Sequence, residues 1–244
     1  MQLLSKLPRS LIVCAFLACS FVTSASAMPI TKQLVVNVIT VCNNAGTDCA
    51  SHGPSGNPFY EAETDKIWAQ AGIDIKFVDF GILSNTALLS GANSVADFTG
   101  PLAGPGTTMY LVKDIVCASC TLLGQAWVDA GGLLINMGAV NAYNAGIGQL
   151  DAIAHELGHN LGINHIDTDL DFLMHSPTDR HIPDSLADIC PDGACYDLLT
   201  SDQIAFARRS TLLIDFVPSS VPEPGSLALV AVALLAGGVA RRRV

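Results

Sequence analysis

The stretch His155-Glu156-Leu157-Gly158-His159-Asn160-Leu161-Gly162-Ile163-Asn164-His165 decides both the fold and the chemistry expected of this sequence. Its first part lies in a predicted helix over residues 149 to 161, in which apolar side chains recur with the helical period. On such a helix, residues 155 and 159 lie one turn apart, so both imidazoles can reach one ion at about 2.0 Å. Gly162 allows a left-handed backbone that costs other residues about 1 kcal/mol or more. This sharp exit from the helix can return His165 as a third ligand.

Glu156 stands beside the ligands on this helix and not among them, about 100° round the axis from His155. In that place a carboxylate can hold a metal-bound water and take its proton. Three nitrogen ligands leave a fourth position open, which is typical of a catalytic zinc and not of a closed structural one. The alternative, an amphipathic core helix with incidental histidines, would bury two imidazoles that need polar partners. We therefore expect Zn²⁺ on His155, His159 and His165, with Glu156 as the catalytic base.

These residues resemble the signature of the metzincin clan of zinc metallopeptidases, His-Glu-x-x-His-x-x-Gly-x-x-His followed by a methionine turn. Met174, nine residues past His165, would be that methionine, an apolar floor beneath the metal that does not bind it. The resemblance implies a peptidase acting on protein or peptide substrates, which lie along an edge strand at residues 124 to 129. In some relatives a tyrosine after the methionine turn assists the metal, but Ser176 follows His175 here, so we assign no such ligand.

The order of predicted elements agrees with the resemblance across the region from 28 to 221. An α+β fold is expected: a twisted, mainly parallel five-stranded sheet with two helices, and a smaller C-terminal subdomain below the active-site cleft. Ala130-Gly131-Gly132 is a strong hairpin turn signal. Strands are predicted at 32–40, 73–80, 108–114, 124–129 and 133–137, and helices from Asn57-Pro58 to Gly72, at 149–161 and from Thr200 to Arg209, with 81–106 and 166–199 mostly irregular.

Both ends of the chain look like processing signals. Residues 1–27 carry Lys6 and Arg9, an apolar run and a closing Ala25-Ser26-Ala27, the pattern of a cleaved signal peptide. Residues 222–244 begin with Pro-Glu-Pro, continue apolar and end in three arginines, a membrane-retention pattern that could also be a permanent anchor. The order of these parts resembles the PEP-CTERM sorting tail. That resemblance implies exosortase-like sorting machinery as a partner, transient membrane association, and export to the cell surface, the extracellular matrix or the medium of a Gram-negative bacterium.

Charge and cysteine content fit an exported domain over 28–221. The whole chain has a net charge of −10, with 12 basic and 22 acidic residues. Without the two ends, which hold five of the basic and one of the acidic residues, the net charge becomes −14. This surface argues against nucleic acid as a partner. Six cysteines remain in the domain, and we expect disulfides between neighbours in sequence, namely Cys42 with Cys49, Cys117 with Cys120, and Cys190 with Cys195.

Two alternatives concern metals and function. Asp167, Asp169 and Asp171 alternate after the third histidine and could bind Ca²⁺, although they match no known ligand loop. His52, His175 and His181 are expected to lie outside the zinc site. The rival function is an extracellular matrix or adhesion module with a structural zinc and no catalysis. A hydrolase acting on bonds other than peptides is a third reading.

Overall fold

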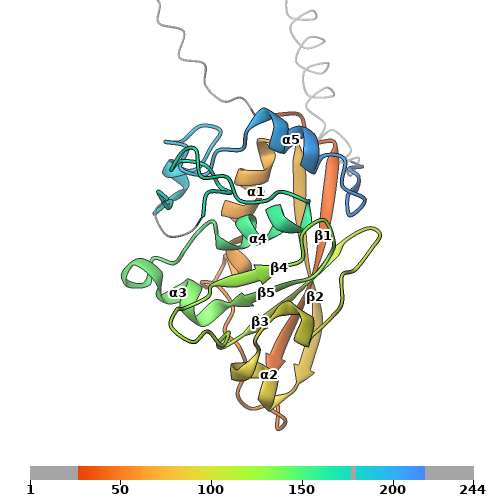
Figure 1. Ribbon diagram of the computed structural model, residues 1–244, viewed down its shortest axis with the longest axis vertical. Helices are drawn as coiled ribbons and strands as arrows, with labels where there is room; N and C mark the ends of the chain where they lie inside the picture. The colour runs from red at the N-terminus through yellow and green to blue at the C-terminus, as the bar shows by residue number, and fades with distance from the viewer. Residues whose placement is uncertain (1–26, 177–179, 218–244) are drawn as a thin grey trace, which may run out of the picture.

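The computed structural model describes residues 27–176 and 180–217, so nearly all of the expected signal peptide and the whole of the expected sorting tail lie outside the described residues. Its centre is a mixed sheet with strand order β2-β1-β3-β5-β4, to which β6 adds beside β1 (Figure 1). Three of its ladders, β1 with β2, β1 with β3, and β3 with β5, are parallel. The α+β class with a mainly parallel sheet is confirmed. The strands are β1 (Lys32–Cys42), β2 (Ile73–Ser84), β3 (Thr107–Val112), β4 (Gly124–Ala126), β5 (Leu133–Asn136) and β6 (Ile214–Asp215).

The α-helices lie between and after these strands, and two of them pack together. Helix α1 packs on β2 and on α4, and α4 packs on β4 and β5. The side chains between these helices and the sheet are fully buried, Trp68 of α1 and Leu157 of α4 among them. The α-helices are α1 (Glu61–Ala69), α2 (Thr86–Gly91), α3 (Met137–Gly146), α4 (Ala152–Asn160) and α5 (Ser201–Ala207).

The first crossover follows the sequence prediction except at the start of its helix. A short 3-10 helix (Pro58–Tyr60) comes first, because Phe59 and Tyr60 have positive φ, so α1 begins three residues later than predicted. Asn57 nevertheless accepts a hydrogen bond from the amide of Ala62 with its side chain. Gly72 ends the helical region with φ +63, as expected.

Several other predicted boundaries are wrong, among them the end of the edge strand, which was predicted at 129 and lies at Ala126. Strand β2 continues to Ser84 because its whole length pairs with β1, across a bulge at Val38/Ile39. The segment predicted to be irregular after residue 80 therefore starts later, and it holds α2 and a 3-10 helix (Val95–Asp97). Helix α4 begins at Ala152, later than the predicted 149.

The hairpin and the C-terminal helix agree closely with the sequence. Strand β4 pairs antiparallel with β5 and is the last strand in the sheet order, so it is an edge strand as expected. Helix α5 starts at the predicted capping box, in which Thr200 and Gln203 bond to each other's backbone amides. The three disulfides join the predicted neighbours, at sequence separations of 7, 3 and 5. Among the residues that the structure describes, none of the helices has the length and apolar character needed to cross a membrane.

Candidate active site

The three predicted ligands meet beside the sheet, two from α4 and one from the loop that follows it. The Nε2 atom of His165 lies 3.0 Å from that of His155 and 3.2 Å from that of His159. Two ligand nitrogens at about 2.0–2.1 Å from a tetrahedral zinc would lie about 3.3–3.4 Å apart. In the part of the chain that the structure describes, these three residues form the one group of His, Cys, Asp or Glu side chains arranged to hold a metal ion.

Backbone carbonyls orient two of the three rings. His155 Nδ1 lies 2.7 Å from the carbonyl oxygen of Leu173, and His159 Nδ1 lies 2.8 Å from that of Ile163. A carbonyl can only accept, so each Nδ1 carries the hydrogen and each Nε2 presents its lone pair to the common centre. Burial lowers the pKa of all three imidazoles, which keeps them neutral, as metal ligands must be. This donor set fits zinc.

Gly162 gives the chain the turn that returns His165. Its φ is +90, in the region that glycine tolerates, and its amide bonds to the carbonyl of His159. A Cβ at this position would lie 2.4 Å from a ring carbon of Phe206 in α5. The backbone and the packing therefore both require glycine here, as the sequence predicted.

Glu156 faces the edge strand next to the histidines. A Cβ on Gly124 of β4 would lie 2.6 Å from the Cγ of Glu156, so a glycine is needed for the strand to pass this close. Burial raises the pKa of Glu156 to about 8, and the Arg180 guanidinium acts in the opposite direction. A divalent cation on the neighbouring histidines would act in the same direction as Arg180, lowering this pKa and favouring the carboxylate.

Met174 lies where the methionine turn was expected. It is fully buried, and a Cβ on Gly158 of α4 would lie 2.4 Å from its sulfur. The methionine therefore packs on the middle of the helix, between the turns that carry His155 and His159. Its neighbour Leu173 supplies the carbonyl that orients His155.

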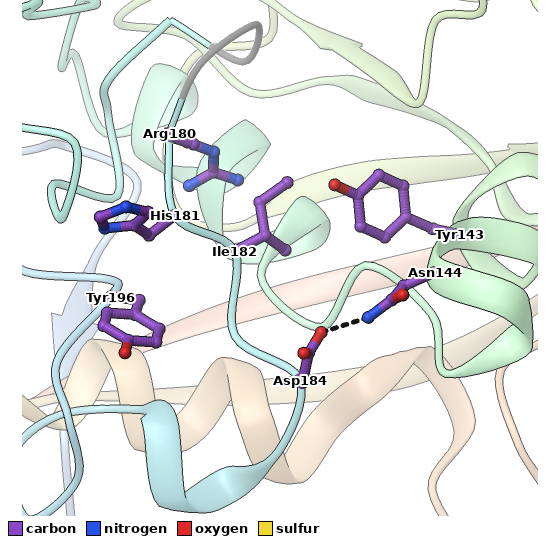
Figure 2. A pocket seen from close by; sticks show the side chains of 7 residues that line it. All are labelled: Tyr143, Asn144, Arg180, His181, Ile182, Asp184 and Tyr196. Atoms are coloured by element: carbon purple, nitrogen blue, oxygen red, sulfur yellow. Dashed lines mark hydrogen bonds between the residues drawn. The ribbon is translucent and has the colours of Figure 1, made fainter.

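A cavity of about 570 Å³ opens beside Glu156 and His155. Apolar groups from the segment before β4, from α3 and from Ile182 form most of its wall. A second cavity of about 580 Å³ shares part of its lining with the first. Figure 2 shows its wall, in which Asn144 donates to Asp184 over 2.5 Å. Tyr143, Arg180 and Ile182 line both cavities.

Sequence reasoning missed α3 and three buried polar residues near this site. Helix α3 ends in three residues with non-helical angles, Tyr143 to Ala145, so its apolar period is short. Asn160, fully buried, accepts from Thr107 and donates to the carbonyls of Trp127 and Gly132, which ties α4 to the β4–β5 hairpin. Arg180 forms a buried ion pair with Asp151. Asp151 directly precedes α4 and Asn160 is its last residue, and these positions are the one signal for the two residues in the sequence.

The three other histidines predicted to lie outside the zinc site are not part of this convergent group, and His175 Nδ1 lies 2.9 Å from the carbonyl oxygen of Ser176. His52 contacts Thr40 at 2.8 Å, and His181 contacts Asp171 at 2.6 Å. The carboxylate of Asp167 accepts from the amide of Ser176. The Ca²⁺ expectation for these aspartates stays a prediction.

Residues 220–243 match the PEP-CTERM protein-sorting motif. The expected resemblance of the tail is thereby found, and this motif is associated with export and surface sorting in Gram-negative bacteria. No curated protein matches the sequence.

Solved structures similar to this chain include archaemetzincins, a zinc-dependent peptidase and a metalloproteinase. Archaemetzincin from Methanopyrus kandleri has 11% identity and a TM-score of 0.44, over 73% of this chain and 95% of its own. A zinc-dependent peptidase from Methanocorpusculum labreanum has 12% identity and a TM-score of 0.42, and the match covers 71% of this chain and 99% of that one. Metalloproteinase-II from Bacteroides fragilis has 13% identity and a TM-score of 0.42, and the match covers 75% of this chain and 54% of that one. A likeness at this level leaves the chemistry to the residues of the site.

Proposed function

We propose that this chain is an exported zinc-dependent endopeptidase. The observation that carries the proposal is the convergence of three Nε2 atoms, two of them oriented by backbone carbonyls, beside the carboxylate of Glu156. Three neutral imidazoles leave a metal coordination position for water or substrate, and a carboxylate outside the ligand set can act as a base.

In this proposal His155, His159 and His165 hold the metal. A zinc ion bound there would polarise a peptide carbonyl and lower the pKa of water towards about 7. Glu156 accepts the proton of the attacking water and passes it to the leaving amine. Met174 keeps the floor of the site apolar, and Gly124 leaves room for the glutamate side chain.

The substrate in this proposal is an extended peptide lying along β4. Within the described residues β4 pairs with β5 alone, so its other edge has backbone groups free to bond a peptide. The cavity beside Glu156 would then take one substrate side chain, and its mostly apolar wall favours a large apolar residue.

We further propose that 28–221 is the catalytic domain, with 1–27 a signal peptide and 222–244 a sorting tail. The match of 220–243 to the sorting motif supports export through exosortase-like machinery. The tail would hold the protein at the membrane only in transit.

Substitution of Glu156 tests the mechanism. In the purified full chain, Glu156→Gln should bind zinc like the parent but cleave casein at least about 100-fold more slowly, because the base is lost. Glu61→Gln, the same chemical change at the start of α1, should leave cleavage unchanged. Equal cleavage by the Glu156 variant and the parent would refute the mechanism. Zinc in the parent without any cleavage would favour the matrix or adhesion module.

A further inference from the structure

A buried ion pair joins the loop after Met174 to the start of the active-site helix. Arg180 Nη1 lies 2.8 Å from Asp151 Oδ2, and the two side chains are 1% and 0% exposed. Asp151 is the N-cap residue of α4, but its side chain makes no capping hydrogen bond. Its carboxylate is therefore directed at Arg180 and not at the helix end.

The same guanidinium nitrogen also contacts the carbonyl that orients a proposed metal ligand. Arg180 Nη1 donates to the oxygen of Leu173 over 2.9 Å, and His155 Nδ1 contacts that oxygen over 2.7 Å. A carbonyl oxygen has two lone pairs, so it can accept both bonds. Figure 2 shows Arg180 on the segment that also carries His181 and Ile182 in the cavity wall.

Stability alone does not account for a fully buried pair of charges. Removing two charges from water costs several kcal/mol per ion, and well-packed apolar residues of similar size often stabilise a fold equally well. A positioning role does account for it, because one charged group with fixed geometry contacts both the first residue before α4 and the Leu173 carbonyl. Helix and loop are thereby joined at the point where the imidazole of His155 is oriented.

We propose that Arg180 and Asp151 are positioning residues of the metal centre. They hold the Leu173 carbonyl against His155 Nδ1, so that Nε2 faces His159 and His165. The inference rests on the proposed function to the extent that the three histidines bind a metal. It concerns metal binding, however, and it can be tested without any measurement of cleavage.

The deciding variant is the double substitution Asp151→Leu with Arg180→Met, which replaces both charged side chains by apolar ones. Its matched control is Asp192→Leu with Lys66→Met. Lys66 also bridges an aspartate and a backbone carbonyl, those of Asp192 and Leu186, each at 2.6 Å, but away from the histidines. Chelator competition measures the Zn²⁺ and Co²⁺ dissociation constants of the full chain. The visible spectrum of the Co²⁺-bound protein and the unfolding midpoint of the metal-free protein are measured as well.

We expect the Asp151/Arg180 double variant to fold and to bind Zn²⁺ about 10- to 100-fold more weakly, with an altered Co²⁺ spectrum, as for other partners of metal-bound histidines. The Asp192/Lys66 control should match the parent in both. Parental affinity and spectrum in the Asp151/Arg180 variant would overturn the inference. If that variant does not fold, Arg180→Lys replaces it, because lysine keeps the charge but not the planar guanidinium. Parental zinc affinity in Arg180→Lys would also overturn the inference.

Measurements on the unsubstituted protein distinguish a failure of this inference from a failure of the proposed function. A parent that binds zinc but cleaves no peptide refutes the peptidase and leaves the metal-binding result standing. A parent that binds no zinc refutes both.

Discussion

Helix α4 and the irregular segment after it contribute to one site in different ways. The helix presents His155 and His159 through its period alone, because residues four apart share a face. The loop must be placed by individual contacts: the left-handed turn at Gly162, the packing of Met174 on Gly158, and the Arg180–Asp151 pair. The helical period therefore brings two of the proposed ligands together, whereas the third depends on the glycine turn, and the orientation of His155 depends on contacts with the loop.

Removing one ligand from each region should give the largest effect. His155→Ala and His165→Ala should each weaken zinc binding by about 100-fold or more, since zinc binding of roughly 10–16 kcal/mol is shared among a few ligands. Cleavage should be lost in both. Chelator competition and casein hydrolysis measure the two effects. His52→Ala, at a histidine bonded to Thr40, is the control. Undiminished zinc affinity in His165→Ala would remove the loop from the metal centre.

The pH dependence of stability should report on a buried carboxyl of the loop region. Burial raises the pKa of Asp197 to about 7, although it accepts bonds from the Cys190 amide and from Gln70. Since this pKa lies above its unfolded value, the folded state binds the extra proton. Its contribution to stability should therefore fall by up to about 4 kcal/mol as pH rises from about 4 to 7.

Urea unfolding at several pH values measures this slope. Asp197→Asn should make this slope shallower between pH 4 and 7, because an amide does not titrate. The same slope in variant and parent would show that another group is responsible.

Gly162→Ala should destabilise the fold by about 2–3 kcal/mol. The left-handed backbone costs about 1–2 kcal/mol for a residue with a Cβ, and the close approach of Phe206 adds an overpacking cost. Thermal unfolding measures the loss. Gly46→Ala provides the comparison, because its φ of +68 is also left-handed but nothing lies within 4 Å of its added Cβ. Equal losses in the two variants would show that the Phe206 contact is unimportant.

The smallest effect is expected at the cap of α5, where local sequence decides again. Thr200→Ala should cost about 1 kcal/mol, because the amide of Gln203 loses its capping acceptor. The free energy of unfolding in urea measures this loss. Ser201→Ala, one residue into the helix, should change it much less, and a larger loss at Ser201 would contradict the assignment of the cap.

The features that the sequence predicted well depend on neighbours along the chain. The ligand spacing, the hairpin turn, the capping box of α5 and the local disulfides are all of this kind. What it missed depends on distant partners. Strand β6 forms only by pairing with the start of β1, and Arg180 meets Asp151 across 29 positions. Neither pairing has a periodic signal, because an isolated arginine in a loop looks like any other surface charge.

The three disulfides have a consequence for how the protein can mature. Each joins a cysteine to the next one along the domain, at separations of 7, 3 and 5. A chain that enters an oxidising compartment N-terminus first exposes both partners of one bridge before the next cysteine arrives. Simple oxidation in order of emergence therefore yields the native connectivity, and no reshuffling enzyme is needed to correct it.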